Sequence, residues 1–285
     1  MLELTVLASG SQGNASVVCA DGRMILIDAG LSPKATRERL YASLRRRPEE
    51  ATDLLLTHLD ADHWRETWRR PIERSGIRVR LHREHVGEAV RCGVPAASIV
   101  PFEDWTDLGE GLRLFACRTP HDERGSTAFL LERRCTVGIT RLGYATDLGR
   151  VSEALIELFR DIDLLALESN YDEELERTSE RPWFLKQRIM GGKGHLSNDE
   201  SVAAAIRIAE SGVPQAIVLL HLSQQCNRPD IVDRVWRERA AHLRERLVIS
   251  DQFRPAPAIT ARPTGRSARI AGVPGSLFED CLSGP

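Results

Sequence analysis

The segment THLDADHW, residues 57–64, is the most informative stretch of this 285-residue sequence. It directly follows an apolar run, so it should begin where a buried strand ends. Within it lie four side chains that are able to bind metal: His58, Asp60, Asp62 and His63. Imidazoles and carboxylates at this density need partners for their charge if they are buried. The segment therefore indicates a metal site, and the alternative interpretation is a solvated acidic loop.

Further acidic and imidazole side chains follow other apolar runs in the same way. They are Asp28 after MILI, His121 after FACRTP, Asp147 after GYAT and His221 after AIVLL. If these strands end at one edge, the side chains converge on one cleft. Taken alone, each residue is more often a turn former or a strand cap. The indication of a shared site comes from their number and their common position.

Short β-rich runs punctuated by Gly, Asp and Pro alternate with helical stretches along the chain. The expected strands cover residues 2–9, 16–20, 24–30, 53–58, 77–82, 112–120, 127–134 and 136–147, and the expected helices 32–47, 152–160, 197–212 and 228–247. This pattern predicts an α/β fold, a four-layer αββα sandwich with helices outside two packed sheets. From residue 252 the composition shifts to Pro, Gly, Ser and Arg. We expect a domain over 1–251 and a poorly ordered tail over 252–285.

Composition narrows the class of protein only broadly. The net charge of −2 gives no sign of a broad basic surface, although it is compatible with a local one. No apolar run approaches the roughly 18 residues that span a bilayer. The start has no basic leader, and the cysteines are scattered without a CxxC pair: Cys19, Cys92, Cys117, Cys135, Cys226 and Cys281. We expect a cytoplasmic protein with reduced thiols and no membrane association.

Several motifs together resemble the metallo-β-lactamase superfamily of binuclear hydrolases. The segment at residues 58–63 resembles the HxHxDH motif of that family with one substitution, and the later ligands match in order and spacing. More narrowly, SGSQGNAS, LIDAGLS, YATDLG, LESNYD, PWFLKQRI, GGKGHLSN and HLSQQCN are similar to the YycJ/WalJ-type branch. Members of that branch are described as metal-dependent 5′-to-3′ exonucleases. The resemblance covers residues 2–250 and implies the αββα fold.

The resemblance implies two divalent ions, manganese or zinc, that would activate water and stabilise a phosphoryl displacement. The implied ligands are His58, Asp60 and His121 for one ion, Asp62, His63 and His221 for the other, and Asp147 as the bridge. Asp60 replaces the histidine of the family motif. Carboxylate oxygen is a harder ligand than imidazole, so the substitution favours manganese. The alternative is that Asp60 turns away and leaves one ion or an unequal pair.

Other residues take roles from the same resemblance. Asp62, His195 and Asp28 are expected to serve catalysis, with Asp28 orienting ligands and His195 donating a proton or holding a phosphate. The expected substrate contacts are Ser11, Asn14, Lys186, Arg188 and Ser197. The alternatives are a hairpin turn at residues 9–16, a solvated helix face at 182–189 and a helix cap at Ser197.

The expected function is a metal-dependent phosphodiesterase, a 5′-to-3′ exonuclease on DNA or RNA that uses a metal-bound hydroxide. Single-stranded nucleic acid or 5′ ends would be the substrate. One alternative keeps the fold and replaces the substrate with a small phosphodiester or a thioester. Another is a non-catalytic, metal-stabilised nucleic-acid-binding protein.

Overall fold

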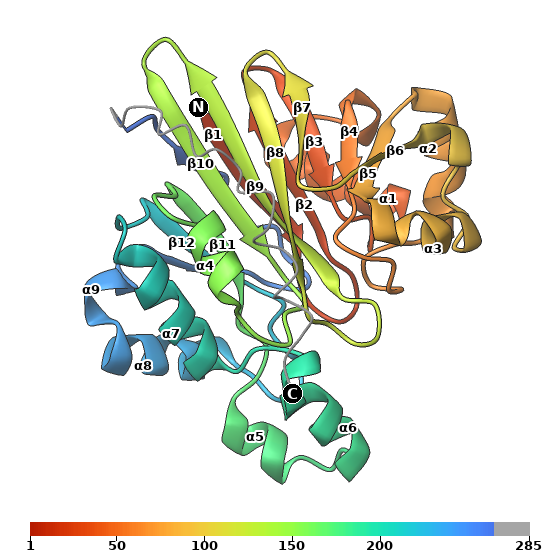
Figure 1. Cartoon of the computed structure of the whole chain (residues 1–285). Coiled ribbons are helices and arrows are strands. Elements are labelled where there is room, and N and C mark those ends of the chain that lie inside the picture. Colours follow the sequence, from red (N-terminus) through yellow and green to blue (C-terminus); the bar gives the residue numbers. More distant parts are fainter. Residues whose placement is uncertain (265–285) are drawn as a thin grey trace.

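The computed structural model describes residues 1–264, and these form two seven-stranded mixed sheets packed face to face (Figure 1). The first sheet has the order β14-β1-β2-β3-β4-β5-β6 and the second β13-β12-β11-β10-β9-β8-β7. The strands of the first are β1 (Leu2–Ala8), β2 (Ala15–Ala20), β3 (Arg23–Ile27), β4 (Asp53–Leu55), β5 (Arg78–His82), β6 (Ile99–Phe102) and β14 (Ile259–Ala261). Those of the second are β7 (Trp105–Gly109), β8 (Leu112–Thr119), β9 (Ser126–Cys135), β10 (Gly138–Ala145), β11 (Leu164–Glu168), β12 (Ala216–Leu220) and β13 (Leu247–Ile249).

Helices cover the outer face of each sheet. The first sheet is covered by α1 (Pro33–Leu44), α2 (Arg69–Ser75) and α3 (Val86–Arg91), and the second by α4 (Glu153–Leu158), α7 (Asn198–Ala209), α8 (Pro229–Arg239) and α9 (Ala241–Arg244). The remaining pair, α5 (Glu173–Thr178) and α6 (Trp183–Arg188), projects from one end as an arm (Figure 1). Short turns lie at Pro48–Glu50, Glu66–Trp68, Arg83–His85, Ala96–Ser98 and Ile189–Lys193. No helix within residues 1–264 is long and apolar enough to cross a membrane.

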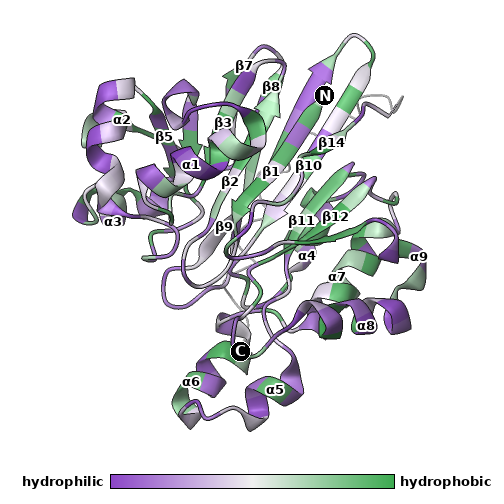
Figure 2. Ribbon diagram, turned by 180° about the vertical axis from the view of Figure 1, so that it is seen from behind, coloured by the Kyte–Doolittle hydropathy of each residue, from purple (hydrophilic) through white to green (hydrophobic). Residues whose placement is uncertain are grey.

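Alternating side chains divide the apolar residues among three layers of packing. Leu4 of β1 and Leu114 of β8 belong to the core between the two sheets. Leu7 lies on the opposite face of β1 and packs in the cluster that includes Leu40 of α1, outside the first sheet. The strands accordingly carry most of the hydrophobic colour, whereas α2 and α8 show hydrophilic outer faces (Figure 2). The predicted four-layer αββα sandwich is therefore confirmed.

Side chains cap the N-termini of α1, α4, α5 and α7. The Ser197 hydroxyl accepts a hydrogen bond from the Glu200 backbone N–H, and the Glu200 carboxylate accepts one from the Ser197 N–H, which is the predicted capping box. The single helix expected over 228–247 is instead broken between α8 and α9. Ala240 leaves the helical region there, and both Ala240 and Leu243 are buried against the second sheet.

The first part of the expected tail is packed structure, which corrects the prediction for residues 252–264. β14 pairs antiparallel with β1 and completes an otherwise open sheet edge. The buried Gln252 side chain accepts a hydrogen bond from the Gln12 N–H at 2.9 Å and donates one to the Gly13 carbonyl at 2.9 Å. β14 is only three residues long and lies between prolines, so its sequence has no alternating hydrophobic pattern that would predict a strand. The remainder of the predicted tail, 265–285, lies outside the described residues.

Candidate metal centre and active site

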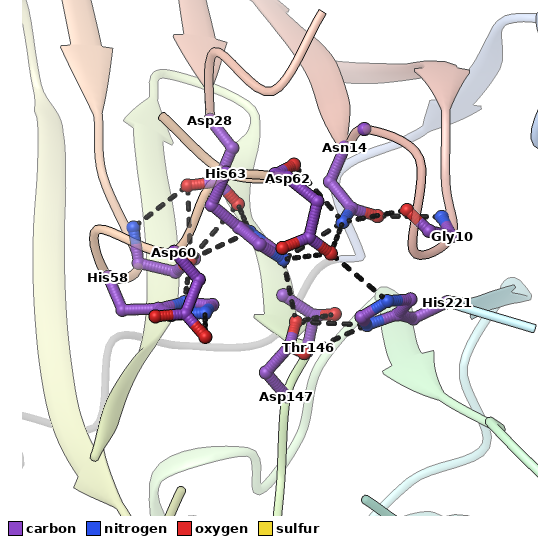
Figure 3. Close-up of polar contacts among 12 residues, drawn as sticks. Gly10, Asn14, Asp28, His58, Asp60, Asp62, His63, Thr146, Asp147 and His221 are labelled. Atoms are coloured by element: carbon purple, nitrogen blue, oxygen red, sulfur yellow. Dashed lines mark hydrogen bonds and ion pairs between the residues drawn. The ribbon is translucent and has the colours of Figure 1, made fainter. Parts of the chain in front are cut away.

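Loops at the ends of both sheets bring the predicted ligands together. The loop after β4 carries the residues of the HLDADH segment, and Asp147 and His221 follow β10 and β12 (Figure 3). Asp28, Asp147 and His221 have φ values of 61°, 55° and 56°, which non-glycine residues seldom adopt. Each of them therefore turns the chain sharply where its strand ends. Such conformations are typical of sites where side-chain direction matters more than local backbone energy.

The first group of candidate ligands is His58, Asp60 and His121, whose ligand atoms all lie within 4.8 Å of one another. Asp60 Oδ2 lies 3.7 Å from His58 Nε2 and 3.9 Å from His121 Nε2. His58 Nε2 is buried, and no residue within 1–264 offers it a hydrogen bond. Burial and the neighbouring His63 hold the pKa of His58 well below its ordinary value. A neutral imidazole with an unpartnered nitrogen fits a bound cation.

The second group is Asp62, His63 and His221, again within 4.8 Å. Asp62 Oδ2 lies 3.7 Å from His63 Nε2 and 3.5 Å from His221 Nε2. Asp147 contacts both groups: its carboxylate lies 2.9 Å from His63 Nε2, 2.9 Å from His221 Nδ1 and 3.8 Å from His121 Nε2. A carboxylate between two groups is placed as a bridging ligand would be.

The electrostatics of the centre favour a cation. Burial disfavours the charged forms of His121 and His221, yet neighbouring carboxylates raise the pKa values of these imidazoles to about 9 and about 10. Burial also opposes the ionisation of Asp147, but His221 and His63 outweigh it and hold the pKa of this carboxyl well below its ordinary value. The negative charge gathered here is what divalent ions neutralise when they replace protons on imidazole.

Residues behind the candidate ligands fix their orientation. The buried Asp28 accepts hydrogen bonds from the Thr57 N–H at 2.9 Å and from His63 Nδ1 at 2.8 Å, which turns His63 Nε2 toward the cleft. His121 Nδ1 donates to the Gly194 carbonyl at 2.8 Å, with the same result for its Nε2. Asp28 thus lies where the expected orienting carboxylate should be.

Sequence reasoning missed Glu168, which ends β11 and is completely buried. Its Oε1 accepts a hydrogen bond from His195 Nδ1 at 2.7 Å, and its Oε2 accepts one from the Leu148 N–H at 2.6 Å. The structure therefore adds a Glu168–His195 pair beside Asp147, whose Oδ1 is 3.5 Å from His195 Nδ1. The signal was available, because Glu168 follows the apolar run LLAL as the other site residues follow theirs.

The expected substrate contacts are placed very differently from one another. Ser11 is exposed and lines the cleft, as does Arg188, which pairs with Asp122. Asn14 is buried, and its Nδ2 lies 2.9 Å from His63 Nε2 and 3.3 Å from Asp62 Oδ2. The Asn14 amide therefore contacts two candidate ligand atoms of the second group directly.

Two of the expected contacts are engaged elsewhere. Ser197 is fully buried and caps α7, the alternative reading of its sequence position. Lys186 Nζ donates to the carbonyls of Arg177 at 2.7 Å and Ser179 at 2.6 Å, which closes the end of α5. Neither Ser197 nor Lys186 lines the cleft, so their geometry favours a structural role over substrate binding.

The cleft has two lobes that meet at the candidate metal centre. The inner lobe has a volume of about 390 Å³ and is lined by residues of both ligand groups, by His195 and by the arm. The outer lobe, about 700 Å³, runs past His58 along Arg124, Gln187 and Lys193. Both volumes are typical of ligand-binding sites, roughly 300–1,000 Å³. The arrangement offers a half-open reaction space joined to a larger groove.

A family model and two curated relatives match most of the chain in sequence. The profile described as "Beta-lactamase superfamily domain" matches residues 23–222. "Exodeoxyribonuclease YycJ" of Bacillus anthracis is 27% identical over 265 residues, covering 88% of this chain and 95% of the relative. "Exodeoxyribonuclease WalJ" of Streptococcus pneumoniae serotype 2 is 29% identical over 237 residues, covering 78% of this chain and 82% of the relative.

Solved structures agree on the fold. The metallo-β-lactamase fold protein YhfI from Bacillus subtilis superposes with a TM-score of 0.67 at 13% identity, covering 90% of this chain and 99% of that one. Zn²⁺-bound PqqB from Methylobacterium extorquens gives 0.62 at 16% identity over 89% and 99%. The matched profile spans most of the chain and includes every candidate ligand. The chain therefore belongs to the β-lactamase superfamily and is a hydrolase of the metallo-β-lactamase fold.

Proposed function

We propose that this hydrolase is a metal-dependent phosphodiesterase that digests DNA from the 5′ end. The observation that carries the proposal is the pair of ligand groups on either side of the buried Asp147, open to a two-lobed cleft. Divalent ions bound there would supply Lewis acidity and lower the pKa of water, as phosphodiester hydrolysis requires. The exodeoxyribonuclease names of the relatives support DNA as the substrate.

The chain's own residues supply proton transfer. His195 lines the inner lobe, and its Nδ1 is held by the buried Glu168. This hydrogen bond fixes the ring and leaves Nε2 as the atom that donates a proton to the departing alcohol. Glu168 is then a positioning residue, because it acts through His195.

The proposed cofactor is a pair of divalent ions, with manganese favoured over zinc. The preference rests on Asp60, whose oxygen faces two imidazole nitrogens of the first group. Its side chain is 52% exposed, compared with 23% for Asp62. A hard and accessible carboxylate suits manganese and a more exchangeable ion.

The proposed partner is nucleic acid in the cytoplasm. Arg124, Arg188 and Lys193 lie along the outer lobe, where they are suited to phosphate contacts of a strand entering the cleft. Glu88 and Glu123 line the same lobe, which keeps the groove from being broadly basic. Free thiols at Cys19 and Cys92 are compatible with a reducing compartment.

The test is digestion of oligonucleotides labelled at either end, with manganese, with zinc and after chelation. We expect metal-dependent shortening from the 5′ end, and loss of activity in Asp147→Ala together with loss of bound metal. Asp230→Ala, an exposed position on α8, is the matched control and should digest normally. Digestion by Asp147→Ala with its metal content intact would contradict the assignment.

The same assay separates the alternatives. Cyclic nucleotides and acyl thioesters, offered in parallel, report on a small-molecule hydrolase. DNA binding without digestion under every metal tested would indicate a non-catalytic binding protein.

A further inference from the structure

The inner lobe contains a second polar group that the metal centre does not use. Arg181, in the turn between the two helices of the arm, lines this lobe together with Ser223 and Gln225 from the loop after β12. We refer to these three residues as the Arg181 group. They bring a cation and neutral hydrogen-bonding side chains to a cavity that the candidate metal ligands also line.

The guanidinium of Arg181 is held in one orientation. Its Nη1 donates to Glu176 Oε2 at 2.7 Å, its Nε to Gln225 Oε1 at 3.0 Å and its Nη2 to Ser223 Oγ at 3.4 Å. The Glu176 side chain is completely buried, so it fixes the arginine from behind, and the Arg181 side chain remains 21% exposed toward the cavity. An arginine has five N–H donors and these contacts engage one on each nitrogen. A planar donor fork with fixed direction is well suited to phosphate oxygens.

The Arg181 group is joined to the candidate metal centre through the backbone. Ser223 lies two residues after His221, and its N–H donates to the Asn170 carbonyl at 2.8 Å. Asn170 Nδ2 in turn donates to the His221 carbonyl at 2.7 Å. The Arg181 guanidinium and the candidate ligand therefore belong to one hydrogen-bonded network, which would hold a substrate at a fixed offset from the centre.

The volume of the inner lobe limits the size of a substrate that fits between the Arg181 group and the candidate metal centre. A volume of about 390 Å³ is near the lower end of small-ligand sites and accommodates one nucleotide better than a longer stretch of strand. The outer lobe shares Asp60, His121 and Arg188 with it, so the rest of the strand has a continuous path outward.

We propose that the Arg181 group binds the terminal 5′-phosphate of the substrate strand and holds one nucleotide between itself and the metal centre. The inference rests on the proposed exonuclease function and deepens it: the preferred substrate is a 5′-phosphorylated end, and the product is a mononucleotide. A 5′-hydroxyl end lacks the group that Arg181 recognises and is positioned less well.

The experiment compares oligonucleotides of one sequence that carry a 5′-phosphate, a 5′-hydroxyl or a 3′-phosphate, with manganese present. The variants are Arg181→Met, Arg181→Lys and the control Arg177→Met, an exposed arginine on α5. We expect the wild-type kcat/KM to favour the 5′-phosphate about 10- to 100-fold, as loss of one charge-assisted contact implies. The ratio should fall to about one in Arg181→Met through KM, recover partly in Arg181→Lys and stay unchanged in Arg177→Met.

Removal of Arg181 leaves Glu176 buried without its partner, which could loosen the arm. The double variant Glu176→Gln/Arg181→Met removes that charge as well and should show the same loss of end preference. Three results would each overturn the inference. The wild-type kcat/KM is the same for the 5′-phosphate and 5′-hydroxyl strands, or it is highest for the 3′-phosphate strand. Alternatively, the double variant loses kcat/KM equally on the 5′-phosphate and 5′-hydroxyl strands.

If the wild type digests no strand, the proposed function fails, and the subsite is decided by binding alone. Calorimetry with a deoxynucleoside 5′-monophosphate and the matching nucleoside should then show at least tenfold tighter binding of the monophosphate, and the difference should disappear in Arg181→Met. Equal binding of the two by the wild type would overturn the subsite independently of digestion.

Discussion

His195 Nδ1 lies 2.7 Å from Oε1 of Glu168, a carboxylate with no solvent exposure. The proposed proton donor is thus held from behind by a group that no substrate reaches. Glu168→Gln should keep the shape of the site but weaken control of the ring, and we expect kcat to fall about 10- to 100-fold with an altered pH profile. Rates are compared with metal content, which should be unchanged. A parallel loss of metal would show instead that Glu168 supports the ions.

Asp60 allows a test of metal selectivity. Asp60→His restores the donor of the family motif, and imidazole should shift the preference from manganese toward zinc. Elemental analysis of protein loaded from an equimolar mixture of the two metals measures the shift. Glu123→His, an exposed position in the outer lobe, controls for a nearby added imidazole. If the metal ratio of Asp60→His matches that of the wild type, Asp60 is not a ligand.

Gly30 sets how closely the ligand loop approaches β2. A Cβ at this position would lie 1.7 Å from the Asp62 carbonyl oxygen and 2.6 Å from the Asn14 nitrogen. Gly30→Ala must therefore push Asp62 outward, and we expect a loss of roughly 2–4 kcal/mol of unfolding free energy and weaker metal binding. Denaturation and metal titration measure both. Gly87→Ala, where the added Cβ meets only Arg91 Nη1 at 3.6 Å, should change neither.

The Asp53 carboxylate links stability to pH at a site remote from catalysis. Burial opposes its ionisation, but hydrogen bonds from Arg80 Nε at 2.6 Å and Arg78 Nη2 at 2.9 Å outweigh burial and lower its pKa. The folded protein therefore binds the proton less readily than the unfolded chain. This contribution to stability is complete above the unfolded pKa of about 3.9 and is lost as pH falls through the lower folded value.

The measurement compares urea unfolding of wild type and Asp53→Asn from pH 7 to pH 3. At pH 7 the variant should be less stable by about 3 kcal/mol, because the buried Arg80 loses its counter-charge. The difference should shrink below pH 4. A difference that is constant with pH would show that folding does not lower the pKa of Asp53.

The layers of the fold and the candidate ligands could be predicted because their signals are local. An apolar run that ends in an acid or imidazole marks Asp28, His121, Asp147 and His221 without knowledge of any partner. Glu168 also follows an apolar run. Its role depends on the hydrogen bond from His195, however, and the whole arm separates these two residues in the sequence. Only the structure shows that these side chains meet in one cleft.

Residues that act through distant pairing were beyond the sequence pattern. Lys186 was expected to face substrate because a basic helix face is all that the sequence shows, whereas its ammonium is engaged by the carbonyls that end α5. Arg181 gave no signal, since its value depends on a buried Glu176 and on a loop more than forty residues away. Propensity and periodicity report on one element at a time, whereas such contacts depend on how elements dock.

Gln252 has a consequence for the order in which the protein matures. Its side chain forms hydrogen bonds with the backbone of Gln12 and Gly13. The next residue, Asn14, contacts His63 and Asp62 through its side-chain amide. The loop at residues 12–13 is thus held by a segment that is translated about 240 residues later. A nascent chain can gather several ligands early, but it acquires the finished centre only after residue 252 has emerged. We therefore expect the candidate metal centre to reach its final geometry late in folding, when the two ends of the first sheet's chain have met.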